Sequence, residues 1–322
     1  MEKQQNILVT GGAGFVGTAL IPVLLDKNHH VMVIDHLNTS KLKRLKRFFP
    51  LDNFEFIKLD LLDEIKLKEI VKKSDLIFHL AANVDVRKGY LNTNVDFRNN
   101  IVATRNVLEA MRASNRCKKI IFTSSSVVYG EALQIPTPEN HGPLRPISLY
   151  GASKLACEAL ISGYAGSFGI NAVIFRLANV IGPSIEHGVI FDFFNKLKQS
   201  KGNYLQILGD GNQTKSYLYI DDCISALLIG MRKFGSALEI FNVGSDDQID
   251  TNTIAKIIID ELRLNPEISH SNDTSNGRGW TGDVKYMLLS TEKLKKIGWK
   301  INYSSEQAVR LTARNIVSHG YD

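Results

Sequence analysis

The chain has 322 residues, of which 44% are hydrophobic and 22% charged, a balance that is ordinary for a soluble globular protein with a sizeable core. Its formal net charge of +6 is modest, and its basic clusters alternate with leucines at helical spacing, so we expect solvated helix faces and no nucleic-acid partner. No apolar run reaches the roughly 18 residues of a transmembrane helix, so we expect no membrane partner. A mild positive field would favour an anionic small substrate.

The three cysteines, Cys117, Cys157 and Cys223, are far apart in the chain and form no C-x-x-C pair or Cys/His cluster. Their odd number and spacing argue against a disulfide framework and a zinc site, and we expect no metal. The N-terminal sequence passes from polar residues straight into a strand-like run at 6–10, which leaves no room for a signal peptide. We therefore expect a cytoplasmic protein.

Short apolar, β-branched runs recur along the first part of the chain, with amphipathic helical stretches between them. These runs are 6–10, 30–35, 54–60, 76–82, 119–125 and 172–178. Continuous hydrophobicity is typical of strands buried on both faces of a parallel sheet. The alternation of strand and helix predicts a doubly wound α/β (Rossmann) fold. After about residue 180 the rhythm weakens, so we expect a first domain over 1–180 and a smaller lobe over 181–322, with some segments returning to the first domain.

Residues 7–25 combine a strand, a glycine turn and a helix. Gly12, Gly14 and Gly17 match G-x-G-x-x-G, in which the glycines make the tight turn, let the backbone approach a pyrophosphate and allow close helix–strand contact. The helix N-terminus offers N–H groups and a partial positive charge to the phosphates. Asp35 ends the second strand, where a carboxylate accepts hydrogen bonds from a ribose 2′-OH and repels a 2′-phosphate. This pattern predicts NAD rather than NADP; the alternatives are a glycine turn without ligand and a strand-end turn carboxylate.

Tyr150 and Lys154 are four residues apart, which places both on one face of a helix. A Y-x-x-x-K match alone is poor evidence, but here it follows, in chain order, the glycine turn, the acidic strand end and a serine-rich strand end. With this order the chain resembles the extended short-chain dehydrogenase/reductase family and, within it, the nucleotide-sugar epimerases typified by UDP-glucose 4-epimerase. The segments that carry the resemblance are 10–17, 79–82, 124–130, 150–154, 176–183, 208–222, 241–245, 282–284 and 295–299.

The resemblance implies which residues carry the chemistry. Ser125 lies four residues before the tyrosine of the segment VYG and 25 before Tyr150, the spacing of the catalytic serine in this family. Tyr150 would act as the base, with its phenolate stabilised by Lys154 and by the nicotinamide. Ser125 would hydrogen-bond the reacting oxygen, with a turn hydroxyl as the alternative role, whereas Ser124 and Ser126 would satisfy backbone groups.

The resemblance also implies the contacts to NAD. They are Gly11, Gly14, Phe15, Val16, Gly17, Asp35, Asn38, Ser40, Asp60, Leu61, Leu80, Ala81, Ala82, Asn100, Tyr150 and Lys154. The family's catalytic set acts on a nucleotide-diphosphate sugar, so the implied partner is a UDP-sugar or a related nucleotide sugar.

On the nucleotide-sugar side, Asn179 resembles the diphosphate contact of the family, and the strand with Gln206 and Leu208 resembles the one whose backbone holds uracil. Ser125 and Tyr150 would contact the sugar. Lys215 stands where the family usually has arginine, which loses the bidentate fork. Arg278 would supply a second phosphate cation, although its spacing differs from the commonest pattern. Met287 falls where the family gates bulk at sugar C2; for these residues a surface or core role stays open.

Sibling 4,6-dehydratases carry an Asp-Glu pair directly after the catalytic Ser/Thr, but here Ser126 and Val127 occupy those positions. Valine cannot transfer a proton, so we do not expect dehydration. The resemblance implies NAD-dependent inversion at C4 through a transient 4-keto sugar, with UDP-glucose and UDP-galactose as the substrates. Two alternatives remain open: a 4-dehydrogenase or reductase with net redox turnover, and a non-catalytic NAD-binding scaffold. The helices of this family commonly pair across a homodimer.

Overall fold

The computed structural model describes residues 3–37, 42–83, 86–271 and 277–319. They form two compact units. We call unit 1 the described residues within 1–124, 152–175 and 224–241, and unit 2 those within 125–151, 176–223 and 242–322. The domain division expected near residue 180 stays a prediction. Among the described residues, no helix is both long and apolar enough to cross a membrane.

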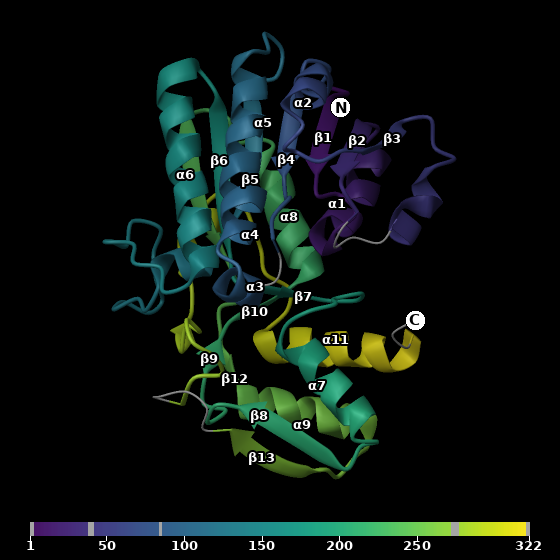
Figure 1. Cartoon of the computed structure of the whole chain (residues 1–322), viewed down its shortest axis with the longest axis vertical. Coiled ribbons are helices and arrows are strands. Elements are labelled where there is room, and N and C mark those ends of the chain that lie inside the picture. The colour runs from purple at the N-terminus through teal and green to yellow at the C-terminus, as the bar shows by residue number, and fades with distance from the viewer. Residues whose placement is uncertain (1–2, 38–41, 84–85, 272–276, 320–322) are drawn as a thin grey trace. The chain divides into compact units, whose positions relative to one another are not determined.

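Unit 1 is built on a seven-stranded sheet with the order β11-β6-β5-β4-β1-β2-β3 (Figure 1). Its strands are β1 (Asn6–Thr10), β2 (His30–Asp35), β3 (Phe54–Lys58), β4 (Leu76–His79), β5 (Lys119–Ser125), β6 (Asn171–Leu177) and β11 (Leu238–Val243). Strand β1 pairs in parallel with β2 and β4, as β2 does with β3 and β4 with β5. The strand order reverses between β1 and β4, the switch point at which such sheets bind ligands. The doubly wound Rossmann fold predicted from the sequence is confirmed.

Two strands end earlier than the apolar runs that predicted them. The runs at 54–60 and 76–82 continue past Lys58 and His79, where β3 and β4 end. The next residues turn at the carboxyl edge of the sheet: the Leu59 amide donates to the Asp35 carbonyl (3.2 Å) and the Leu80 amide to the Thr10 carbonyl (3.2 Å). Hydrophobicity cannot mark this end, because Leu59 is still buried in the core.

Helices cover both faces of the sheet of unit 1. They are α1 (Phe15–Asp26), η1 (Leu42–Phe48), α2 (Glu64–Val71), α3 (Val86–Leu91), α4 (Asn94–Asp96), the π-helical η2 (Phe97–Val102), α5 (Ala103–Arg112), α6 (Leu149–Phe168) and α8 (Ile220–Gly230). On one face Ile120 and Ile174 pack in a core with α2, α5 and α6 (Figure 1). On the other face Phe175 lies against Gly230 of α8, where an added Cβ would be 2.7 Å from its ring. Burying each such side chain contributes roughly 1.5–3 kcal/mol.

Unit 2 contains three small sheets. Strand β7 (Asn179–Ile181) pairs with β10 (Tyr217–Tyr219), β9 (Thr214–Lys215) lies between β12 (Ile249–Asp250) and β14 (Tyr286–Met287), and β8 (Tyr204–Leu208) pairs with β13 (Glu267–Ser271). Its helices are η3 (Ser126–Tyr129), α7 (Val189–Gln199), α9 (Thr251–Leu262), α10 (Glu292–Lys295) and α11 (Ser305–His319). Asp222 ties the end of the chain to this unit, because its carboxylate accepts from the amides of Asn302 and Tyr303.

Candidate functional site

The glycine turn after β1 is packed too closely for side chains. A Cβ added at Gly11, whose φ is 68°, would lie 2.7 Å from the Cα of Ala81. One added at Gly12 would lie 2.6 Å from the Val33 side chain, and one at Gly17 would lie 2.5 Å from the Gly12 Cα. Gly11 therefore supplies the left-handed turn, and Gly12 and Gly17 let the turn, β2 and α1 approach each other.

The N-terminus of α1 has the features of an anion site. Gly14 is its N-cap and makes no side-chain capping bond, and the first turn of α1 holds no acidic residue. A Cβ added at Gly14 would meet only the Gly11 carbonyl oxygen within 4 Å, at 3.1 Å. The amides of Phe15, Val16 and Gly17 belong to the first helical turn, where no intrahelical acceptor exists. Backbone N–H groups and the helix dipole at this position suit a pyrophosphate, so the cradle fits NAD.

Asp35 lies at the end of β2, next to the glycine turn. Its side chain is buried, and its carboxylate accepts from the amides of Ala13 (3.2 Å) and Leu37 (2.8 Å). These bonds hold the carboxylate at the turn. A fixed negative charge there suits a ribose diol and disfavours a 2′-phosphate. Asn38 and Ser40, also expected to contact NAD, lie outside the described residues.

The other expected NAD contacts of unit 1 divide into two groups. Leu80, Ala81 and Ala82 follow β4, and Asp60 and Leu61 follow β3, so both segments lie at the carboxyl edge that carries the glycine turn. The position of Gly11 against the Ala81 backbone shows how close the first segment comes.

Asn100 instead lies inside unit 1. Its Oδ1 accepts from the Asn83 amide (2.8 Å), and its Nδ2 donates to Ser153 Oγ (2.8 Å). These bonds connect η2 to α6, and the expected contact of Asn100 with NAD stays a prediction.

A buried chain of polar side chains connects the glycine turn to the helices. His79, at the end of β4, has Nδ1 2.7 Å from Thr10 Oγ1 and Nε2 3.0 Å from Thr104 Oγ1. Thr104 Oγ1 in turn donates to Cys157 Sγ of α6 (3.2 Å). Burial, with the nearby charge of Lys154, lowers the pKa of His79 to about 3, so its ring is neutral at neutral pH. This network fixes α5 and α6 on the strands that carry the predicted site.

Lys154 of α6 is buried at the end of β5. Its Nζ donates to the Thr123 carbonyl (2.9 Å) and lies 4.7 Å from the centroid of the Phe122 ring. Burial lowers the pKa of Lys154 to about 8. Ser125 ends β5 two residues after Thr123, and the half-buried Tyr150 lies one helical turn before Lys154. The Lys154 ammonium is thus held at the end of the strand that carries Ser125.

Ser124 differs from the expectation that it would satisfy a backbone group. Its Oγ donates to Oε1 of Glu158, a buried carboxylate of α6, over 2.5 Å. The physical reason is the spacing of α6, because Glu158 lies four residues after Lys154 on the same helix face. Ser126 is buried at the start of η3.

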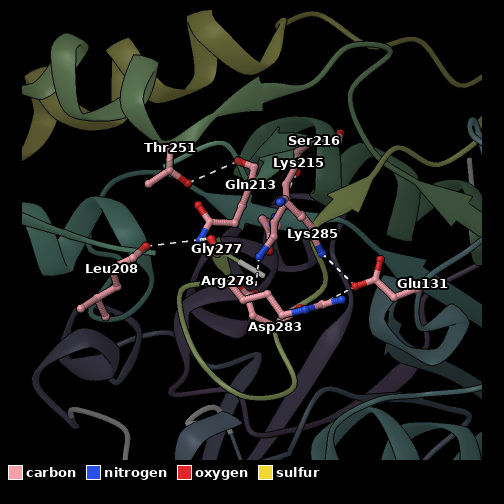
Figure 2. Close-up of polar contacts among 11 residues, drawn as sticks. Glu131, Leu208, Gln213, Lys215, Ser216, Thr251, Gly277, Arg278, Asp283 and Lys285 are labelled. Atoms are coloured by element: carbon pink, nitrogen blue, oxygen red, sulfur yellow. Dashed lines mark hydrogen bonds and ion pairs between the residues drawn. The ribbon is translucent and has the colours of Figure 1, made fainter. Parts of the chain in front are cut away.

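Unit 2 brings together the predicted phosphate cations (Figure 2). Lys215 Nζ lies 2.5 Å from Asp283 Oδ1. Arg278 donates to the Asp283 carbonyl and forms an ion pair with Glu131. The Glu131 carboxylate also accepts from the Lys285 amide (3.2 Å). We call Lys215, Arg278, Asp283 and Glu131 the cation cluster. In it, the two cations are paired with two carboxylates. An incoming anion could replace a carboxylate as the partner of either cation.

Two further predicted residues bond to sequence neighbours of this cluster or to a residue that does. The Asn179 amide nitrogen and Nδ2 both donate to the carbonyl of Ser216, the residue after Lys215 (3.4 and 3.3 Å). Leu208, at the end of β8, accepts through its carbonyl from Gln213 Nε2 (3.3 Å), and the same nitrogen donates to the Gly277 carbonyl (3.1 Å), as Figure 2 shows.

Two predicted substrate residues have settings of their own in unit 2. Gln206 lies two residues before Leu208 with an exposed side chain, and its carbonyl accepts from Lys196 Nζ (2.9 Å). Met287 of β14 is buried and pairs with Lys215 in register.

Glu131, Gln213 and Glu158 are among the polar residues of these regions that were not assigned from the sequence. Glu131 meets Arg278 across 147 positions, a separation that leaves no local signal. Gln213 is recognisable only as a buried amide between two loops. Glu158 had a usable signal, because it continues the spacing of Tyr150 and Lys154 by one more helical turn.

The chain is similar to known proteins along most of its length. Residues 7–244 match the model of the NAD dependent epimerase/dehydratase family. A putative UDP-glucose 4-epimerase of Methanocaldococcus jannaschii is 31% identical over 308 residues, which cover 94% of this chain and 96% of that protein. A crystal structure of a UDP-galactose 4-epimerase matches with a TM-score of 0.87 at 38% identity, covering 98% of this chain and 100% of the other. A UDP-N-acetylglucosamine 4-epimerase from Methanobrevibacter ruminantium, in complex with UDP-N-acetylmuramic acid, has a TM-score of 0.85 at 31% identity and covers 98% and 99%.

Proposed function

The chain belongs to the NAD-dependent epimerase/dehydratase family, and from this premise we propose that it interconverts UDP-glucose and UDP-galactose. It is an NAD-dependent nucleotide-sugar 4-epimerase, hence an isomerase. The observation that carries the proposal is the buried Lys154 ammonium on the Thr123 carbonyl. That charge lies at the end of the strand carrying Ser125 and one helical turn from Tyr150.

The residues around the glycine turn would hold the cofactor. The amides at the start of α1 would bind its pyrophosphate, and Asp35 would accept hydrogen bonds from a ribose hydroxyl. When bound, NAD supplies the hydride acceptor and returns the hydride to the sugar. Gly11 comes so close to the Ala81 backbone that a side chain at this position would clash with it.

The chemistry of this chain's own residues is proton transfer. A free phenol has a pKa of roughly 10, so Tyr150 needs a nearby positive charge to act as a base near neutral pH. Lys154 supplies it. Tyr150 then removes the proton from the C4 hydroxyl and returns a proton to O4 after the sugar has presented its other face. Ser125 donates a hydrogen bond to the reacting oxygen and relays its proton.

Dehydration needs further groups that move protons at C5 and C6. The positions after Ser125 are Ser126, which is buried at the start of η3, and Val127, whose side chain has no ionisable group. A 4-keto intermediate formed by this chain therefore returns to the alcohol. This distinction favours epimerisation within a family whose name covers both reactions.

The cation cluster supports a nucleotide-diphosphate substrate. Lys215, Arg278 and Asn179 would bind the two phosphates, with Lys215 as a point charge and Arg278 through its several N–H donors. The backbone around Gln206 and Leu208 would bind the base. The relatives that act on UDP-sugars support uracil as that base.

We further propose that the protein is a cytoplasmic homodimer. The resemblance to the epimerase family supports the dimer, and three buried free cysteines suit a reducing compartment. Sedimentation of the purified protein would test the dimer, and the mass of a single chain would contradict it.

The test of function uses catalytic amounts of the purified protein and no added cofactor. It should convert UDP-glucose to UDP-galactose and back to one equilibrium mixture, read by chromatography of the sugars. Stoichiometric accumulation of NADH would instead support the 4-dehydrogenase. Turnover of a GDP- or dTDP-sugar without reaction of UDP-hexoses would keep the mechanism and overturn the substrate.

A further inference from the structure

Glu158 is a buried carboxylate that the mechanism above does not use. It is 5% exposed, lies on α6 eight residues after Tyr150 and four after Lys154, and so shares their helix face. Its Oε1 accepts from Ser124 Oγ over 2.5 Å. A carboxylate that is removed from water is costly unless charges or hydrogen bonds compensate it. A positive charge on the same helix face would add to the compensation that the Ser124 hydroxyl gives this carboxylate.

Lys154, four residues before Glu158 on this face, supplies a positive ammonium group whose pKa the Glu158 carboxylate raises. The ionisable groups that interact electrostatically with its ammonium are Cys157 and Glu158 of its own helix, Asp96 of α4 and His79 of β4, and Tyr150 lies one helical turn before it on the same helix face. His79 is neutral at neutral pH, and burial raises the pKa of Cys157, so its thiol stays protonated. The negative charges that oppose the desolvation of Lys154 are therefore those of Glu158 and Asp96.

The two carboxylates are held in different ways. Asp96 Oδ1 accepts from Asn83 Nδ2 (2.8 Å) and Asn100 Nδ2 (3.3 Å). Glu158 is bonded by Ser124, the residue directly before Ser125. Lys154 itself donates to Thr123, directly before Ser124. Lys154 and Glu158, on one face of α6, thus form hydrogen bonds with two successive residues of β5, just before the strand ends at Ser125.

We propose that Glu158 is a positioning residue that keeps the Lys154 ammonium charged and aimed at the end of β5, an inference that rests on the proposed roles of Tyr150 and Lys154. Two neighbouring serines at the end of β5 then have different roles. Ser125 serves the reacting oxygen, and Ser124 orients the carboxylate that supports the lysine. Glu158 acts through Lys154 and touches no substrate.

The physical consequence lies on the alkaline side of the pH profile. The active state needs Lys154 protonated beside the Tyr150 phenolate, so activity falls as pH rises and the ammonium loses its proton. A nearby negative charge raises the pKa of an ammonium, typically by about 1 unit or more when the two groups are buried close together. Neutralising Glu158 removes that support, so the ammonium is lost at lower pH.

The test is the pH dependence of kcat/KM for Glu158→Gln, which keeps the shape and the acceptor for Ser124. Its basic limb should move to lower pH by about one unit or more. The matched control is Glu69→Gln, which removes a carboxylate from the exposed side of α2 and should leave the limb in place. Ser124→Ala keeps the charge of Glu158 and should move the limb less than Glu158→Gln. An unmoved limb in a folded Glu158→Gln variant would overturn the proposal.

A second measurement needs no activity. Removing one partner of a buried charge pair is far costlier than removing both. Lys154→Met should therefore lower the Tm. The double variant Lys154→Met/Glu158→Gln should have a higher Tm than Lys154→Met alone. This comparison can be made even if the single variant Glu158→Gln folds poorly. A double variant no more stable than Lys154→Met would contradict the pairing. Because this readout is independent of turnover, it separates a failure of Glu158 from a failure of the proposed function, which Tyr150→Phe tests alone.

Discussion

The glycine turn of unit 1 and the cation cluster of unit 2 hold their geometry by different means. In the turn, an added Cβ at Gly17 would lie 2.5 Å from the Gly12 Cα, so close backbone packing fixes the shape before any ligand arrives. In the cluster, Lys215 and Arg278 are held by ion pairs, which an anionic ligand can exchange. We therefore expect changes in the turn to affect both the fold and NAD binding, and changes in the cluster to affect mainly the affinity for the proposed substrate.

The largest effect is expected in the turn. Gly17→Ala places a Cβ against backbone that cannot move aside, so it should abolish NAD binding and lower the Tm. The matched control is Gly163→Ala on α6, where an added Cβ meets nothing within 4 Å; it should raise the helix propensity and bind NAD normally. Calorimetric titration with NAD and thermal unfolding measure both. Normal NAD binding by Gly17→Ala would show that the backbone of the turn can move to accommodate the added Cβ, and would contradict this prediction.

The next effect concerns the residue proposed as base. Tyr150→Phe keeps the ring and removes the proton acceptor, so kcat should fall by roughly 10²-fold or more while NAD still binds. Steady-state turnover of UDP-glucose and NAD titration measure the two quantities. Near-full activity would remove Tyr150 from the site.

A smaller effect is expected in the cluster. Arg278→Gln removes a cation from the proposed diphosphate site, so the affinity for UDP should fall by roughly 10- to 100-fold, since a charge-assisted hydrogen bond contributes roughly 1.5–3 kcal/mol. The Tm should stay within a few degrees because the side chain is held by an ion pair near the surface. Arg105→Gln is the control: Arg105 pairs with Glu64 at 2.7 Å on unit 1 and should leave UDP affinity unchanged. An equal loss of UDP affinity in both variants would show that the overall charge of the protein, and not a specific site at Arg278, determines UDP binding.

The smallest expected effect is on the preference for NAD over NADP. Asp35→Ala removes the carboxylate that repels a 2′-phosphate, so the preference for NAD over NADP should narrow by a few-fold to tenfold. Some loss of NAD affinity should accompany it, because the bond to the Ala13 amide also goes. Calorimetry with both cofactors decides. Equal affinity of the unaltered protein for NAD and NADP would remove the basis of this prediction.

Much of unit 1 could be predicted because its signals are local. Buried parallel strands are continuous apolar runs, and the glycine turn and the Tyr150–Lys154 spacing are short patterns. The ends of β3 and β4 could not, because the Leu59 and Leu80 amides bond to the neighbouring strands at points where the sequence gives no break. The chain continues apolar past both points.

The predictability of the site follows the same division. Ser125, Tyr150 and Lys154 lie at fixed separations that one sequence can display. Glu131 has no local signal, and only its distant partner Arg278 gives it a role. Glu158 shows its helix face through its spacing from Lys154, but its bond to Ser124 is visible only in the structure. What a single sequence lacks is the identity of partners brought together by folding.

The central claim, that the hydride returns to the carbon it left, has one direct measurement. UDP-glucose carrying deuterium at C4 is incubated with catalytic enzyme and no added cofactor, and the product is analysed by mass spectrometry and NMR. We predict UDP-galactose with the deuterium retained at C4, because the Ser125/Tyr150/Lys154 set moves only protons and the hydride stays in the site. Loss of the label, or a 4-keto sugar that accumulates with reduced cofactor, would contradict the account.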